Sequence, residues 1–169
     1  MKPSLLPWHR LSLLLLSLIL PLSLRGADVL EQRNIGMELA RDLASEAVLA
    51  CRKAGYQVAA VVVDRDANLR AVLRDDLAPR FTVEIARRKA NMAIMGGIDT
   101  GELVRRRADI RQELNHIDGL IMMEGGLPVV VGGYRVGAIG ISGAPGGDKD
   151  AACARAALEA LAERIEFAE

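Results

Sequence analysis

Few residues of this 169-residue chain could do chemistry, and His116 is the first of them. The chain has one other histidine, His9, which lies in an apolar N-terminal stretch. A neutral imidazole can ligate a metal ion, and it can exchange a proton near neutral pH. His116 follows a polar segment in which a loop could present it to a ligand. The alternative is a histidine that lies on the surface or caps a helix.

Two cations and four methionines complete the set of candidate ligand-binding side chains. Lys89 and Arg74 could pair with a carboxylate of a ligand, because their charged groups suit carboxylate oxygens. For Lys89 a salt bridge to Asp75 or Asp76 is an equally good reading. A thioether can also ligate iron, but methionines at helical spacing usually lie in the core; the four are Met92, Met95, Met122 and Met123.

Catalytic motifs are not found. The chain contains no H-E-x-x-H, no cluster of His and Cys with metal-ligand spacing and no C-x-x-C. Ser142 lies in G-I-S-G, in which the second glycine comes one position too early for a nucleophile elbow. The sequence therefore favours a binding protein over an enzyme.

The glycine-rich segment 125–150, GGLPVVVGGYRVGAIGISGAPGGDKD, does not have the spacing of a phosphate loop. The acids at its end would repel a phosphate, whereas they suit the first turn of a helix. We expect Gly125-Gly126 and Gly132-Gly133 to form hairpin turns. Gly137 and Gly140 lie within a strand, where glycine often marks the close approach of a backbone or a ligand.

Hydrophobic periodicity places these residues on helices and strands. Helices are expected at 35–54, 81–95 and 148–167, with two short helical turns in the polar segment between 99 and 119. Strands are expected at 58–63, 69–73, 121–123, 127–131 and 136–142. Short connections between strands indicate a mostly antiparallel sheet with helices on its faces. The sequence predicts one α+β domain over residues 27–169.

Two cysteines, Cys51 and Cys153, lie in predicted helices. A disulfide between them requires the two helices to pack side by side. The alternative is two small, separate core residues.

The first 26 residues have the order of a secretory signal peptide: a charged start, an apolar run and small residues at 26–27. Removing Lys2, Arg10 and Arg25 leaves 19 basic and 22 acidic residues, which argues against nucleic acid as a partner. We expect a periplasmic or secreted protein with no membrane span after cleavage.

Several segments resemble one known family. The GG-x-P at 125–128, the strand GAIGISG at 137–143 and Asp148 at the start of the last helix recur in this order in the GlcG/HbpS family, which includes the PduO C-terminal domain. The helix segment IARRKANMA at 85–93, with Lys89, is similar to the same family. The hairpin at 58–76 is also similar, although Asn68 replaces a glycine and Asp76-Leu77-Ala78 replaces an Asp-Gly-Ala.

The resemblance implies a five-stranded antiparallel sheet in an α-β-α, profilin-like sandwich, which usually forms a homo-oligomer. It also implies haem as the ligand. No family motif covers His116, and it is a possible iron ligand on its chemistry alone, because imidazole is a common axial ligand. We expect the ligand-binding site to be formed by His116, Lys89, Arg74, Gly125, Gly126 and Asp148. Two alternatives stay open: an accessory enzyme that degrades haem or acts on a small organic acid, and a structural oligomer without a ligand.

Overall fold

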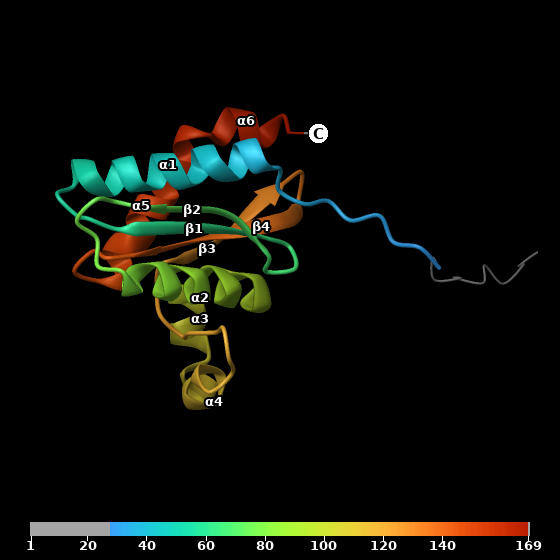
Figure 1. Cartoon of the computed structure of the whole chain (residues 1–169). Helices are drawn as coiled ribbons and strands as arrows, with labels where there is room; N and C mark the ends of the chain where they lie inside the picture. Colours follow the sequence, from blue (N-terminus) through green and yellow to red (C-terminus); the bar gives the residue numbers. More distant parts are fainter. Residues whose placement is uncertain (1–27, 169) are drawn as a thin grey trace, which may run out of the picture. The chain divides into compact units, whose positions relative to one another are not determined.

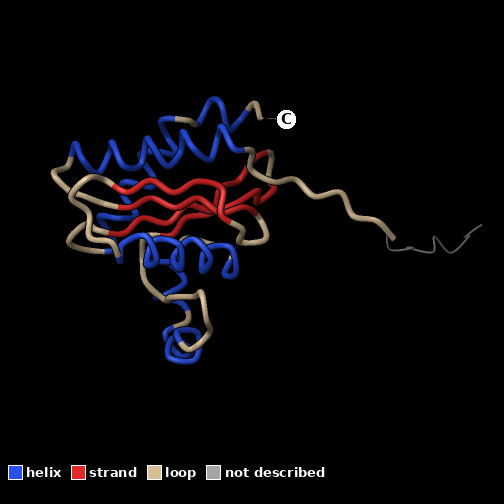
Figure 2. Tube along the Cα trace, in the orientation of Figure 1, coloured by secondary structure: helices blue, strands red, loops and turns tan. Residues whose placement is uncertain are grey.

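Strand β1 (Ala59–Asp64) lies at the centre of a four-stranded sheet, and all six of its residues are buried. In the computed structural model, which describes residues 28–168, the strand order is β2-β1-β4-β3. The neighbours are β2 (Leu69–Arg74), β4 (Tyr134–Ser142) and β3 (Gly126–Val131), and every pairing is antiparallel. The predicted α+β class and antiparallel sheet are confirmed, and within residues 28–168 every helix and strand lies after Gln32 (Figure 2).

The expected fifth strand, residues 121–123, is wrong. The N–H of Met122 donates to the side chain of Asn115 at 2.7 Å, and the N–H of Met123 bonds to the carbonyl of Ile121 at 3.0 Å. These local bonds leave no ladder for a neighbouring strand, so there is no hairpin around Gly125-Gly126. The turn at Gly132-Gly133 is confirmed, because both residues have positive φ between β3 and β4.

Two helical layers cover the sheet (Figure 1). Helix α1 (Met37–Lys53) and helix α5 (Gly147–Ala160) lie on one face, and α2 (Phe81–Gly96) lies on the other. The last predicted helix is divided, because Leu161 leaves helical geometry at φ −107° before α6 (Ala162–Glu166). None of the helices in the described part of the chain is both long and apolar enough to cross a membrane.

Glycines in β4 let α2 approach the sheet closely. A Cβ on Gly140 would overlap the carbonyl oxygen of Ala86 and lie 2.7 Å from the N of Ala90. The prediction that a backbone approaches this strand is therefore confirmed at Gly140, and the partner is a helix.

A small helical extension follows α2 (Figure 1). It contains α3 (Thr100–Arg106), a 3-10 turn (Ala108–Ile110) and α4 (Arg111–Asn115), three short helical segments where two helical turns were expected. Its core is a satellite cluster of Met92, Leu103 and Met122.

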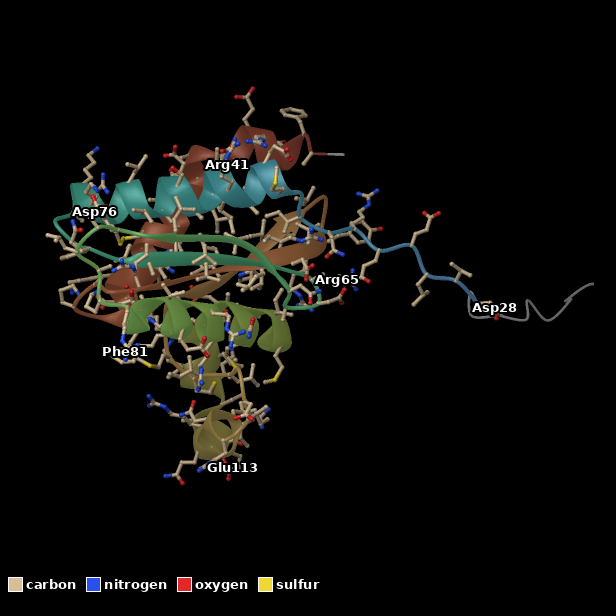
Figure 3. The ribbon with its side chains drawn as sticks, in the orientation of Figure 1. Asp28, Arg41, Arg65, Asp76, Phe81 and Glu113 are labelled. Carbon is tan, nitrogen blue, oxygen red and sulfur yellow. A yellow bond between two sulfur atoms is a disulfide. The ribbon has the colours of Figure 1, made fainter. Side chains whose placement is uncertain are left out.

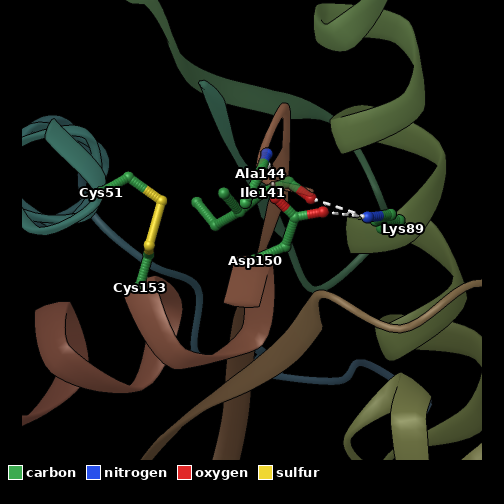
Figure 4. The surroundings of a disulfide bond; sticks show 6 residues. All are labelled: Cys51, Lys89, Ile141, Ala144, Asp150 and Cys153. Carbon is green, nitrogen blue, oxygen red and sulfur yellow. Dashed lines mark hydrogen bonds and ion pairs between the residues drawn. A yellow bond between two sulfur atoms is a disulfide. The ribbon is translucent and has the colours of Figure 1, made fainter. Parts of the chain in front are cut away.

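A disulfide joins the two helices of one layer. Cys51 of α1 and Cys153 of α5 are bonded, with their Cα atoms 5.3 Å apart, which is ordinary for a disulfide (Figure 4). The alternative of two separate core cysteines is therefore wrong.

Candidate functional site

The residues that carried the family resemblance meet at a buried ion pair between α2 and α5. The ammonium group of Lys89 lies 2.7 Å from Asp150 Oδ2 and donates to the carbonyl of Ile141 at 3.0 Å. The two charged side chains are only 2% and 4% exposed. Figure 4 shows both interactions beside the disulfide. Lys89 is thus directed inward, and two protein oxygens accept hydrogen bonds from its ammonium group.

Asp150 is held from a second direction. Its other carboxylate oxygen accepts the backbone N–H of Ala144 at 3.0 Å. Burial raises the pKa of Asp150 above its usual range, and the Lys89 ammonium opposes that shift without reversing it. We call Lys89, Asp150, Gly125, Gly126 and Thr100 the buried node.

Gly125 and Gly126 belong to this node because of space. A Cβ on Gly125, where φ is +118°, would lie 2.9 Å from Lys89 Nζ and 2.8 Å from Asp150 Cβ. The N–H of Gly126 donates to the hydroxyl of Thr100 at 2.9 Å, and a Cβ there would lie 2.9 Å from Thr100 Cγ2. The two glycines therefore allow the surrounding protein groups to pack closely on the backbone at the node.

Asp148, the acid chosen from the sequence, is not part of the node. Its carboxylate is exposed and lies 3.5 Å from Lys149. Sequence reasoning missed Asp150 and Thr100. The signal for Asp150 was available, because it precedes Ala154 and Ala157 by four and seven residues and so shares their buried face of α5.

Arg74 forms no hydrogen bond with the residues of the buried node. Its guanidinium donates to the carbonyl of Ala78, which closes the loop after β2. The salt bridge expected between Lys89 and Asp75 or Asp76 is wrong, because Asp75 pairs with Arg52 of α1. The hydrogen bond from Arg52 lowers the pKa of Asp75 below its ordinary value.

His116 lies at the end of α4, exposed to solvent. Its Nδ1 is 2.7 Å from the backbone carbonyl of Gln112, and since a carbonyl can only accept, Nδ1 carries the proton in this bond. In the neutral ring this tautomer has its lone pair on Nε2. Histidines that ligate metals commonly donate their other ring N–H in this way, which fixes the tautomer and the ring.

The loop after His116 is tied to the body of the protein. Asn91 of α2 donates to the carbonyl of Gly119 at 3.0 Å, and Met122 is fully buried in the satellite cluster. The helical extension therefore presents His116 from a braced support. The labelled Glu113 in Figure 3 shows the end of this extension.

The residues of the extension suit haem as far as donor chemistry is concerned. His116 offers one imidazole, and one is enough for an iron that is already held by a porphyrin. Arg105 and Arg111 are exposed guanidinium groups without an ion pair among the described residues, and Ile117 is an exposed apolar side chain. In the described part of the chain, no group of three or more His, Cys, Asp or Glu side chains is placed to hold a bare metal ion.

Of the four methionines, Met92 and Met122 are core residues with no exposed surface. Met95 and Met123 remain 49% and 40% exposed, so only their thioethers could reach a ligand.

The described residues form an antiparallel sheet between two helical layers, with the Lys89–Asp150 ion pair buried between α2 and α5. A family model described as haem degrading protein HbpS-like matches residues 35–159. The chain belongs to this HbpS-like family, and the resemblance read from its motifs is confirmed.

Solved structures agree with this assignment. A crystal structure of HbpS is 38% identical to the chain, with a TM-score of 0.75, over 81% of this chain and 96% of that one. A double mutant of Streptomyces reticuli HbpS is 37% identical, with a TM-score of 0.75, over 84% and 97%.

A PduOC:haem complex shares the fold at 24% identity, with a TM-score of 0.67, over 75% of this chain and 94% of that one. Among curated proteins, the search finds no match.

Proposed function

We propose that the mature chain is an exported protein that binds haem, with His116 as the iron ligand and without catalysis of its own. The observation that carries the proposal is the bond from His116 Nδ1 to the Gln112 carbonyl, which leaves Nε2 free for a metal on an exposed site. Support comes from the family description and from the haem complex of the structural relative PduOC. Bound haem would supply a redox-active iron.

The roles of the other candidates follow from their surroundings. Arg105 and Arg111 lie on the same extension as His116 and would pair with the haem propionates. Lys89 cannot reach a ligand without breaking its ion pair with Asp150. The carboxylate of Asp150 would then be an unpaired charge in the protein interior, which is strongly destabilising. We therefore assign Lys89, Gly125 and Gly126 to the support of the site rather than to ligand contact.

The test is a titration of the disulfide-intact mature chain with haemin. We expect a saturable Soret shift in the wild type and its loss in His116→Ala. The matched control is Met123→Ala, which removes an exposed thioether that could also ligate iron. A wild type without a shift, or a shift that survives in His116→Ala and disappears in Met123→Ala, contradicts the proposal.

Export and assembly are parts of the same proposal. The predicted signal peptide, residues 1–26, lies outside the described residues, but a disulfide is typical of an oxidising compartment. We expect the mature chain to begin at residue 27 when the gene is expressed with its leader, as measured by intact mass. We also propose a homo-oligomer, which light scattering on the mature chain tests directly.

The second candidate function is haem degradation, which the description of the matching family favours. In that case haemin with a reductant and oxygen would lose its Soret band in the presence of native protein and keep it beside urea-denatured protein. Loss at equal rates in both samples would leave binding as the function.

A further inference from the structure

A groove of about 380 Å³ lies on the α1 side of the sheet, between the segment before α1 and the C-terminal residues. Its volume is within the range of pockets for small organic ligands. Figure 1 shows α1 and α6 on the side of the sheet opposite to α2 and the helical extension. The groove is therefore separate from His116, and none of its lining residues belongs to the buried node.

The groove has an apolar part formed by the core edge. Ile35, Leu39, Val131 and Val136 line it, and each is less than a tenth exposed. Phe167 lines the same groove and is 73% exposed, so its ring stands at the rim with most of its surface uncovered. An apolar ligand group would gain free energy by covering these carbons.

The polar part of the groove consists mainly of donors. Arg33 lines it and forms no ion pair or hydrogen bond among the described residues; its guanidinium is placed by stacking over the Tyr134 ring at 4.8 Å. The side chain of Asn34 accepts from the N–H of Arg65 through Oδ1, which leaves its amide protons for another acceptor. Arg164 also lines the groove but pairs with Asp42 at 2.5 Å.

One acid, Glu38, is among the lining residues, and since Arg164 is paired with Asp42, Arg33 is the lining cation whose charge is not compensated by an ion pair among the described residues. The first backbone bond of α1 runs from the N–H of Ala40 to Gly36, which leaves earlier first-turn N–H groups as additional donors beside the groove. An acceptor-only ligand group satisfies such a set, and a carboxylate is the acceptor that a guanidinium fits best.

We infer that this groove binds a small organic acid, with its carboxylate on Arg33 and its apolar group against Leu39, Val136 and Phe167. Glu38 disfavours dianions and the volume of about 380 Å³ limits the size of the ligand, so the expected class is a monocarboxylate with one ring or branched chain.

Benzoate is the probe, and its neutral isostere benzamide is the matched ligand control. In amide NMR of the haem-free mature chain, benzoate should shift the signals of residues 36–39 saturably, with benzamide at least about tenfold weaker. Arg33→Gln should weaken benzoate by about tenfold, since a charge-assisted bond is lost. The control Arg80→Gln removes an arginine that stacks on Phe81 at 4.2 Å outside the groove, and it should leave benzoate affinity unchanged.

Three results would overturn the inference. They are no saturable shift up to about 10 mM benzoate, equal affinity for benzoate and benzamide, and wild-type affinity in Arg33→Gln. The comparison of the two ligands uses the wild-type chain, so it decides even if a variant folds poorly. Haem is absent throughout, which keeps this outcome distinct from that of the haemin titration.

Discussion

Lys89 and His116 are basic side chains with opposite surroundings. The Lys89 ammonium is buried against Asp150 and a backbone carbonyl, in the middle of the motifs that identify the family. His116 is exposed, has one local bond to Gln112 and lies in none of those motifs. The difference indicates that the shared motifs build the junction of α2, α5 and β4, while ligand chemistry is left to a less constrained extension.

We expect the largest loss of stability when the buried ion pair between Lys89 and Asp150 is broken. Asp150→Asn leaves the Lys89 charge without its partner in an apolar interior, and such a loss costs about 3–5 kcal/mol of unfolding free energy. The control Asp148→Asn changes an exposed carboxylate two residues earlier and should stay within about 0.5 kcal/mol. Urea unfolding of both variants measures the difference. Equal effects would show that burial of the pair does not distinguish these two acids.

The disulfide holds α5, the helix that carries Asp150, against α1. Its cysteines are separated by 102 residues, so its loss should destabilise the fold by about 2–4 kcal/mol, mostly through the unfolded chain. Unfolding midpoints with and without reductant measure this effect. Reductant should leave a Cys51→Ala/Cys153→Ala double variant unchanged, and a shift there would mean that the reductant acts elsewhere.

Most of the fold was predictable because its signals are local. Helical spacing of Leu39, Leu43 and Ala47 places α1, and the β-branched run of β1 matches a strand buried on both faces. Residues 121–123 were misread because a three-residue apolar run does not reveal whether it pairs as a strand or packs in a satellite core. Here Met122 packs in the core.

The site was less predictable because its contacts are distant in sequence. Lys89 and Asp150 are 61 residues apart, and the choice between Asp148 and Asp150 depended on which face of α5 is buried. The disulfide could not be decided either, since helical position alone does not show which helices are neighbours. The role of His116 was also hard to predict, because this residue lies in no sequence motif that would indicate a ligand.

Asp75 is intermediate between Lys89 and His116 in its exposure to solvent. Its buried carboxylate forms an ion pair with Arg52, whose side chain is half exposed. Its pKa is lowered in the folded protein, so its contribution to stability is complete above the unfolded value of about 3.9 and is lost as the pH falls below it. Asp75→Asn should therefore differ from the wild type more at pH 6 than at pH 3. Urea unfolding at the two pH values measures this. A constant difference would mean that the Arg52 pair contributes nothing that titrates.

The smallest effect on stability is expected at His116. Its replacement by Ala removes one hydrogen bond at an exposed helix end, so the unfolding free energy should change by no more than about 0.5 kcal/mol. The same variant should lose the haemin Soret shift, whereas Asp150→Asn, measured under conditions where it is folded, should keep it. These results would show that the buried node determines stability and that the extension determines haem binding. Loss of haem binding in both variants, with His116→Ala strongly destabilised, would show instead that the extension and the buried node act as one unit.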